Sequence, residues 1–498
     1  MDIFHFPTVS ALVASLNVQP DASYGVNAAQ ASPMQRRYFE SSARELRRLW
    51  DAAELEVPAG VGASDVEALA RRLVARHEAL RLRHTPDGDV WHYAAHEEAS
   101  IFTHRDLSTL PESERNAALR ARAEEAGGSL GFGGDPLLSL TLLTCGEGQA
   151  SRLLVVTHRL IADDASRRIL LEELRDGLRQ DGERHPPRPA SPPVPFSLAV
   201  SQMGALARSP EVLGELSYWL SETRRRVRPL PRDYTEARAA AEAPVGVCEF
   251  ELGADLAEAI LSNAGRGSPR RPEATMLAAL VLAFAKLTGA RPILVDLPVD
   301  GREQMAENID LSGAVGNFDS VFPFLLGLGG AEGEAALSAA SEQLRAVPNG
   351  GLGYGLLRYM NDDYEAAAKL RELPQAEVWF AYRRTVAPTT PLSTDEGGDL
   401  GIVAPPYVIG PYLFAVEVLP GIVGELKIRW SYREDVYRRA TVEALGRSFV
   451  AELGTLAEQC RRSGPEGYAP SDFRRVALDQ QKLNSILEKV GLASDEKR

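Results

Sequence analysis

A proline-rich run from His185 to Pro195 separates two stretches in which helical and strand-like patterns alternate. Proline cannot continue a helix or a central strand, so we interpret the run as a boundary between two structural units. One hydrophobic core stops growing at roughly 250–300 residues, and this chain has 498 residues. The pattern therefore predicts an α/β protein with one lobe over residues 32–190 and a second lobe over residues 191–469.

Individual elements are predicted from their periodicity. Apolar residues at helical spacing indicate amphipathic helices over residues 63–84, with Ser64 as N-cap, and over residues 165–178. Segments rich in leucine and valine indicate buried strands over residues 138–143 and 152–157. In the second stretch the same patterns predict helices over residues 196–207, 211–224, 275–289 and 437–460, and strands over residues 246–252, 293–297, 376–382, 413–419 and 425–432.

Charge and composition argue against several classes of function. The net charge is −14, whereas a nucleic-acid-binding protein needs a basic surface for phosphates. No apolar run approaches the roughly 20 residues of a membrane helix, and the first residues lack the basic start and apolar stretch of a secretory signal. The three cysteines (Cys145, Cys248 and Cys460) lie far apart, so we expect neither structural disulfides nor a metal site. We find no cofactor motif, and a reducing cytoplasm is the expected location.

Four short motifs occur in a fixed order: Ser32–Gln35, Arg76–Arg81, His158–Asp164 and Tyr218–Trp219. In this order they resemble the S/T-P-M-Q, R-H-E-x-L-R, HHxxxDG and Y-W motifs of the condensation-domain superfamily of nonribosomal peptide synthetases. The resemblance covers residues 30–470. It implies two chloramphenicol-acetyltransferase-like lobes in a V-shaped arrangement with a central cleft.

Three later segments are similar to the epimerization branch of that superfamily. Val315–Pro323 resembles V-G-W-F-T-S-x-F-P, and Pro348–Gly355 fits PxxGxGYG at every fixed position. Phe380–Tyr382 resembles F-N-Y, with alanine in place of asparagine. A glycine run also occurs in tight turns that need a positive φ, and this second interpretation is compatible with the resemblance.

The positions that handle protons in this superfamily carry residues that cannot do so here. The resemblance places Arg159 where the family has the second histidine of HHxxxDG, and a guanidinium stays protonated up to a pH above about 12. It also places Pro298 where epimerization domains have the first glutamate of E-G-H-G-R-E. A general base needs a pKa near the working pH, so we do not expect catalysis by the family mechanism.

The other motif residues are expected to hold the site together. We expect His158 to be a hydrogen-bonded core residue, because buried polar groups are normally paired. In the family the aspartate of the motif is structural, so we expect Asp163 to pair with Arg302 of the other lobe. We also expect Arg159 to be held by Asp163 or Asp164, because a buried arginine needs a carboxylate. A pair between Asp164 and Arg159 would plug the tunnel between the lobes.

The pattern HRxxxDD on an epimerization-like frame resembles the X-domains of glycopeptide antibiotic synthetases. The resemblance implies an inactive domain that recruits cytochrome P450 oxygenases, which cross-link aromatic side chains of the carrier-bound peptide. Residues 1–17 are similar to the last helix of a peptidyl carrier domain, and residues 18–31 would link it to the first lobe. Residues 470–498 are expected to lead toward a thioesterase domain.

A recruiting domain needs contacts on its outer surface, and the helix after the motif is a candidate. If its apolar stripe faces the core, solvent-facing arginines are left to meet an acidic patch on an oxygenase; these are Arg167, Arg168, Arg175 and Arg179. The alternative is that they only solvate the helix or pair with its own acids. Two other functions stay open: an active condensation or epimerization domain that uses another base, and a decayed domain that acts as a spacer.

Overall fold

The computed structural model describes residues 30–40, 46–85, 90–94, 101–131, 135–146, 149–180, 192–234, 244–262, 272–289, 292–305, 309–383, 412–421, 424–463 and 485. Four predictions concern residues outside these ranges: the carrier-like segment 1–17, most of the linker 18–31, the lobe boundary at residues 190 and 191, and nearly all of the tail 470–498. They stay predictions.

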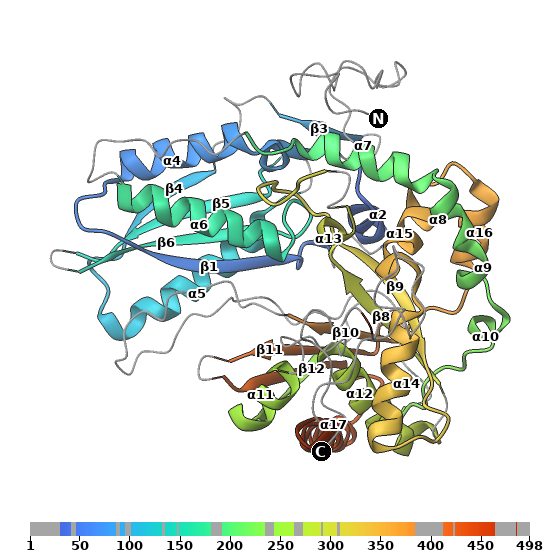
Figure 1. The fold of residues 1–498 in the computed structure, drawn as a ribbon. Coiled ribbons are helices and arrows are strands. Elements are labelled where there is room, and N and C mark those ends of the chain that lie inside the picture. The colour runs from blue at the N-terminus through green and yellow to red at the C-terminus, as the bar shows by residue number, and fades with distance from the viewer. Residues whose placement is uncertain are drawn as a thin grey trace.

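The first lobe contains the elements up to residue 180. They are α2 (Pro33–Phe39), β1 (Trp50–Val57), α4 (Ala63–Arg76), the 3-10 turn η2 (Glu78–Arg81), β2 (Leu82–Thr85), β3 (Val90–Tyr93), β4 (Phe102–Asp106), α5 (Glu112–Ser129), β5 (Leu138–Thr144), β6 (Ser151–His158) and α6 (Asp164–Gln180). Four of the strands form one sheet in the order β1-β6-β5-β4. β6 runs antiparallel to both β1 and β5, whereas β4 is parallel to β5. Figure 1 shows α4 and α6 on one face of this sheet and α5 on the other.

Successive side chains of β6 point to the two faces of the sheet in turn. Leu153 and Val155 belong to the main core. Leu154 and Val156 belong to a smaller core, in which they join Trp50 of β1 and apolar residues of α5. Both faces of β6 are therefore buried, which explains why its sequence is a nearly continuous apolar run.

The second lobe contains the elements from residue 196 onward. They are α7 (Phe196–Ala207), α8 (Pro210–Gly214), α9 (Leu216–Trp219), α10 (Glu222–Arg225), β7 (Val245–Leu252), α11 (Ala254–Ser262), α12 (Pro272–Thr288), β8 (Ile293–Val299), α13 (Gly301–Met305), β9 (Ser320–Leu326), α14 (Gly333–Arg345), the 3-10 turn η4 (Pro348–Gly351), α15 (Leu352–Tyr359), α16 (Tyr364–Arg371), β10 (Val378–Tyr382), β11 (Phe414–Pro420), β12 (Leu426–Arg433) and α17 (Arg439–Ser463). The six strands form a mixed sheet in the order β7-β12-β11-β10-β8-β9.

Aromatic rings fill the space between this sheet and its helices. Phe284 of α12 and Phe449 of α17 both contact Trp430 of β12, each with ring centroids 5.9 Å apart. Phe414 of β11 lies 5.6 Å from Phe284 and 5.9 Å from Trp430. All four side chains are fully buried. Aromatic rings bury large apolar areas, so this cluster fixes α12 and α17 against the strands.

The two lobes share one continuous core. A single cluster of buried apolar residues includes members from β5, β6 and α6 and from every strand of the second sheet. Helix α2 precedes the first sheet in sequence but packs on α15 and β9 of the second lobe. Its Arg36 donates a hydrogen bond to the backbone oxygen of Tyr359 (2.6 Å), and Glu40 forms an ion pair with Arg358 (2.9 Å).

Most predicted elements are confirmed to within a few residues, and two are wrong. The helix predicted over residues 63–84 ends at Arg76, because buried His77 turns to bond Glu173 of α6 and the chain continues into η2 and β2. Its N-cap is Gly62 instead of Ser64. The helix predicted over residues 211–224 is three short helices, α8 to α10. The backbone of Ser221 (φ −59°, ψ 147°) leaves the helical conformation and separates the last of them from α9.

Candidate functional site

The site lies in the loop between β6 and α6, which carries the motif His158–Asp164. His158 is the last residue of β6 and is fully buried. Its Nε2 lies 2.9 Å from the backbone oxygen of Leu46, and its Nδ1 accepts a hydrogen bond from the backbone N–H of Leu160 (3.1 Å). Burial lowers the pKa of His158 to about 4. The histidine is therefore neutral and structural at neutral pH, as a paired core residue should be.

Arg159 is held by Asp51 of β1, so the expected pairing with Asp163 or Asp164 is wrong. The pair is bidentate: Nε of Arg159 lies 2.9 Å from Oδ2 of Asp51, and Nη2 lies 3.0 Å from Oδ1. The antiparallel register explains it, because Trp50 opposes His158 and Asp51 therefore lies beside the end of β6. Burial disfavours the charge of Asp51, but Arg159 and Arg167 outweigh it and lower the pKa of this carboxyl.

Asp163 joins the two lobes. Nη2 of Arg302 in α13 lies 2.9 Å from Oδ1 and 3.1 Å from Oδ2 of Asp163, so the expected pair is present. The same carboxylate accepts hydrogen bonds from the backbone N–H groups of Ser166 (2.7 Å) and Phe318 (3.0 Å). Asp163 thus caps the N-terminus of α6 and links the loop before β9 to this helix.

Asp164 pairs with arginines on both lobes. It contacts Arg167 within α6, and its Oδ1 lies 3.3 Å from Nη1 of Arg383, which follows β10. Arg383 also contacts Glu417 of β11 at 3.1 Å. Burial opposes the charge of Asp164, but Arg383 and Arg167 outweigh it and hold the pKa of this carboxyl well below its usual range. Arg383 was not among the predicted site residues.

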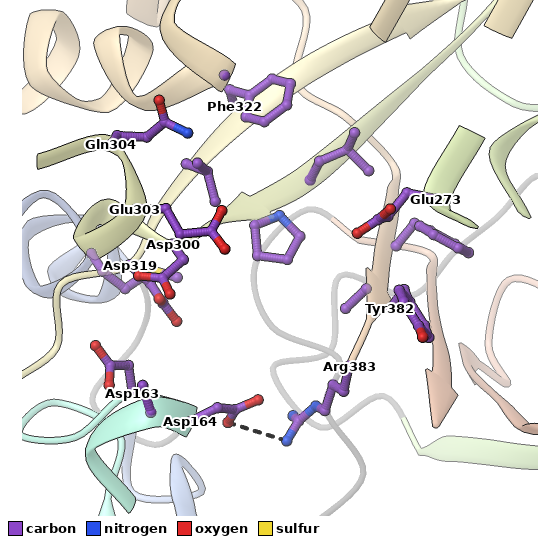
Figure 2. A pocket seen from close by; sticks show the side chains of 18 of the residues that line it. Asp163, Asp164, Glu273, Asp300, Glu303, Gln304, Asp319, Phe322, Tyr382 and Arg383 are labelled. Atoms are coloured by element: carbon purple, nitrogen blue, oxygen red, sulfur yellow. Dashed lines mark hydrogen bonds and ion pairs between the residues drawn. The ribbon is translucent and has the colours of Figure 1, made fainter. Parts of the chain in front are cut away.

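A cavity of about 420 Å³ lies between these residues. The pair between Arg159 and Asp164 that was expected to plug the tunnel is replaced by two other pairs: Arg159 binds Asp51, and Asp164 binds Arg383. Closure of the tunnel stays a prediction. Figure 2 shows the bridge between Asp164 and Arg383 at one side of the cavity. Apolar and aromatic side chains complete the lining, among them Met34, Tyr38, Leu277, Leu297, Phe322, Trp379, Phe380 and Tyr382.

One wall of the cavity carries carboxylates that the sequence-based prediction missed. Pro298 of β8 lines the cavity without an acidic group, but Asp300 and Glu303 follow it closely and Asp319 precedes β9. In Figure 2 these three side chains gather on the same side. Burial and the charges of neighbouring aspartates raise the pKa of Asp319 well above its ordinary value, and burial also raises the pKa of Asp300. Asp319 and Asp300 stand where the motifs V-G-W-F-T-S and E-G-H-G-R-E have threonine and histidine, whereas Glu303 matches the last glutamate of the second motif. The two aspartates were therefore the available signal.

The four arginines of the predicted docking surface differ in accessibility. Arg167 is buried and contacts Asp51 at 3.0 Å, so its assignment to an outer surface is wrong. Arg168 and Arg179 are exposed, and Arg175 is half-buried. Arg168 lies 3.4 Å from Glu172 on the same helix. The apolar stripe of α6 is buried as expected, through Ile169, Leu170, Leu174 and Leu178.

The described residues form neither a metal-binding cluster nor a membrane-spanning helix. No three side chains of histidine, cysteine, aspartate or glutamate are placed to bind a metal ion within the described ranges. Within the same ranges, no helix has the length and apolar character to cross a membrane.

Comparisons with known proteins agree with the motifs. The family model of the condensation domain matches residues 27–478. The chain is 28% identical over 497 residues to a linear gramicidin synthase from Brevibacillus parabrevis, across 97% of this chain and 10% of that protein. It is 31% identical over 513 residues to chondramide synthase cmdD of Chondromyces crocatus, across 99% of this chain and 13% of that protein. The chain thus spans only a small part of these curated relatives.

Solved structures with this fold include three informative ones. The epimerization domain from the third module of tyrocidine synthetase B has a TM-score of 0.73 and 23% identity, across 88% of this chain and 98% of that one. The X-domain from teicoplanin biosynthesis has a TM-score of 0.63 and 20% identity, across 86% and 95%. The complex of the X-domain and OxyB from teicoplanin biosynthesis has a TM-score of 0.59 and 19% identity, across 86% and 93%. At these identities the likeness concerns the fold, and it confirms the predicted α/β architecture.

Proposed function

We propose that this chain, which belongs to the condensation-domain family, is a recruitment domain without catalytic activity in a nonribosomal peptide synthetase. Like an X-domain, it would bind cytochrome P450 oxygenases so that they cross-link aromatic side chains of a carrier-bound glycopeptide precursor. The observation that carries the proposal is the bidentate pair between Arg159 and Asp51. It fixes a permanent cation where the family pattern has its proton-handling histidine.

Two further features of the site support the absence of catalysis. Pro298 stands in the position of the epimerization glutamate and offers no group that could take up a proton. His158 is fully buried and bonded through both ring nitrogens. A catalytic base must reach the proton that it removes, and neither position provides one.

The recruitment role rests on the HRxxxDD motif and on the likeness to the teicoplanin X-domain, which has also been solved in complex with OxyB. We assign the docking surface to the outer side of α6, with Arg168, Arg175 and Arg179 as contacts for an acidic patch of the oxygenase. Arginine is enriched in protein interfaces, and charge complementarity speeds encounter and fixes orientation. The peptidyl carrier and thioesterase domains of the same synthetase are the other proposed partners.

A binding experiment tests this assignment. Arg168, Arg175 and Arg179 are changed together to glutamate, and affinity for a cytochrome P450 oxygenase, with OxyB from teicoplanin biosynthesis as the probe, is measured at low and high salt. The matched control changes Arg439, Arg447 and Arg461 of α17, which are exposed and, like Arg168, pair with glutamates of their own helix. We expect at least tenfold weaker binding for the α6 variant at low salt and no change for the control. Equal affinity of both variants would place the interface elsewhere, and no binding by the unaltered chain would refute recruitment.

The second candidate is an active condensation or epimerization domain. Its support is that the cavity is open and that Glu303 lines it. Incubation with a carrier-bound peptidyl thioester in heavy water separates the two functions. Deuterium incorporation at the peptide α-carbon, or amide formation with an acceptor thioester, above a control without protein would refute the inactive domain.

A further inference from the structure

A second pocket, which we call the α10 pocket, lies on the second lobe. It is formed by α9 and α10, the segment 226–230 that follows them, the end of α12, and the adjoining ends of β8 and β9. Its volume is about 570 Å³, in the range of pockets that hold small organic molecules, roughly 300–1,000 Å³. Figure 1 shows α10 on the side of this lobe that faces away from α6. The α10 pocket shares no lining residue with the cavity beside Asp164.

The lining of the α10 pocket is basic, although the chain as a whole has a net charge of −14. Its charged side chains are Arg224, Arg226 and Arg228, and none of the described residues that line it is acidic. Arg226 lies 3.0 Å from Glu222, and both side chains are exposed. Arg228 is exposed and forms no ion pair with a described residue. The pocket therefore offers a guanidinium group to an anion from outside the chain.

Arg224 points more directly to an anionic ligand, because it is 6% exposed and still lines the pocket. Its Nη1 donates a hydrogen bond to the backbone oxygen of Pro323 (2.6 Å), and its guanidinium carbon lies 4.8 Å and 5.0 Å from the ring centres of Tyr218 and Trp219. Burial lowers the pKa of Arg224, and no carboxylate of the described residues opposes this shift. The buried arginines beside the motif each contact an aspartate. A buried cation without an anion is unfavourable, so Arg224 lacks a partner that a ligand can supply.

Apolar side chains form the rest of the α10 pocket. They come from the segment after α10 and from the adjoining ends of β8 and β9, and they are Val227, Pro229, Leu230, Pro292, Ile293 and Leu325. Val227 and Leu325 are only half-buried, so part of their apolar surface is available for contact. A ligand that matches both parts of the lining has an anionic group at one end and an apolar body at the other.

We propose that the α10 pocket binds a small organic carboxylate, with its anionic group on Arg224 and Arg228 and its apolar body against Leu230 and Ile293. The planar fork of a guanidinium group matches the two oxygens of a carboxylate. A phosphate dianion fits less well, because a pocket with so much apolar lining would have to remove water from two charges instead of one. This binding site goes beyond the proposed recruitment role, which uses the outer side of α6 on the other lobe.

Isothermal titration calorimetry with matched probes at neutral pH tests the ligand class. The probes are 3-phenylpropanoate, its neutral isostere 3-phenylpropanamide, acetate, and inorganic phosphate. We expect 3-phenylpropanoate to bind about tenfold or more tightly than each of the other three, because only this probe combines a single negative charge with an apolar body. A smaller preference over the amide, over acetate or over phosphate would overturn the inference, and so would no binding of 3-phenylpropanoate at about 10 mM.

Single substitutions assign the binding to this pocket. Arg228→Gln removes the exposed cation and should weaken binding of 3-phenylpropanoate about tenfold. Arg224→Gln removes the buried cation and should abolish binding in a folded variant. The matched control is Arg225→Gln, because Arg225 is exposed on the same helix and does not line the pocket. At moderate salt its removal should leave the affinity unchanged.

Circular dichroism checks the fold of each variant. If Arg224→Gln does not fold, the comparison of Arg228→Gln with Arg225→Gln decides, because both residues are exposed. Unchanged affinity in a folded Arg228→Gln variant, or an equal loss in the control, would refute the assignment. No oxygenase takes part in these measurements, so their failure leaves the recruitment proposal unaffected.

Discussion

Replacement of Asp51 by asparagine should destabilise the protein strongly. Asp51 is 3% exposed, accepts two hydrogen bonds from Arg159, and lies 3.0 Å from Nη1 of Arg167. Asparagine keeps the shape of the side chain but leaves two mostly buried guanidinium groups without this carboxylate. Loss of one partner of a buried ion pair costs about 3–5 kcal/mol, because the remaining charge stays desolvated.

Urea unfolding at pH 7 measures this loss through the midpoint and slope of the transition. The control is Glu67→Gln on α4, which removes an ion pair with Arg71 at 2.6 Å whose side chains are 46% and 75% exposed. We expect the control to cost less than about 1 kcal/mol, as exposed pairs do. If Asp51→Asn costs no more than Glu67→Gln, the reasoning about a compensated arginine at position 159 is wrong.

The pH dependence gives the same prediction a second readout. Arg159 and Arg167 outweigh the cost of burial and lower the pKa of Asp51 in the folded state. Its contribution is therefore present above the unfolded pKa, near 3.9, and is lost as the pH falls through the lower folded pKa. The difference in stability between the unaltered chain and Asp51→Asn should persist down to about pH 4 and shrink below it. A difference that vanishes already at pH 6 would point to another group.

Two further predictions concern single substitutions. Arg159→His should not produce epimerization of a peptidyl thioester, because Pro298 still leaves the glutamate position without an acid; isotope exchange at the α-carbon above background would contradict this. Asp319→Asn should raise the melting temperature at pH 8 by about 1–3 °C. Burial and the charges of Asp163, Asp164 and Asp300 raise the folded pKa of Asp319, and the attraction of Arg302 opposes them only in part. Because the folded pKa is raised, the stability contributed by protonated Asp319 is complete below the unfolded pKa and is lost as the pH rises. Asparagine does not ionise, so the gain in melting temperature should be present at pH 8 and should disappear near pH 4 in thermal scans.

The helices and strands were predictable where apolar residues recur at a regular spacing. Strand β1 has no such spacing and was not predicted. The segment Trp50–Val57 contains Asp51, Glu54 and Glu56 and does not read as a buried strand. In the structure, Asp51 meets Arg159, and Glu54 lies 3.0 Å from Arg152 on the neighbouring strand β6. The charges of Asp51 and Glu54 are thus compensated by arginines in β6 and directly after it, about 100 residues away in sequence. Local patterns cannot reveal such pairing.

The site residues also divide into those that a motif predicts and those that depend on how the strands and lobes pack. The pair of Asp163 with Arg302 could be expected, because the family resemblance places both residues. The partner of Arg159 depends on the register of β1 against β6, which no motif encodes. Arg383 and Asp319 come from segments far apart in the second lobe. Arg383 contacts Asp164 at 3.3 Å, and Asp319 lies close enough for its carboxylate and that of Asp164 to repel each other. The motif itself contains two acids, Asp163 and Asp164, but the partner of Arg159 lies outside it, on β1.

The pattern of charges at the motif also bears on whether this domain has merely decayed. A chain that loses a catalytic histidine by drift should collect buried charges without partners, each at a cost of several kcal/mol. Here Arg159 has Asp51, and Asp163 has Arg302. Asp164, in the position of the family glycine, is met by Arg383 across the lobes. Each charged residue of the motif is thus balanced while the cavity beside it stays open. Such compensation preserves the local structure of the motif, which a recruiting surface requires and a passive spacer does not.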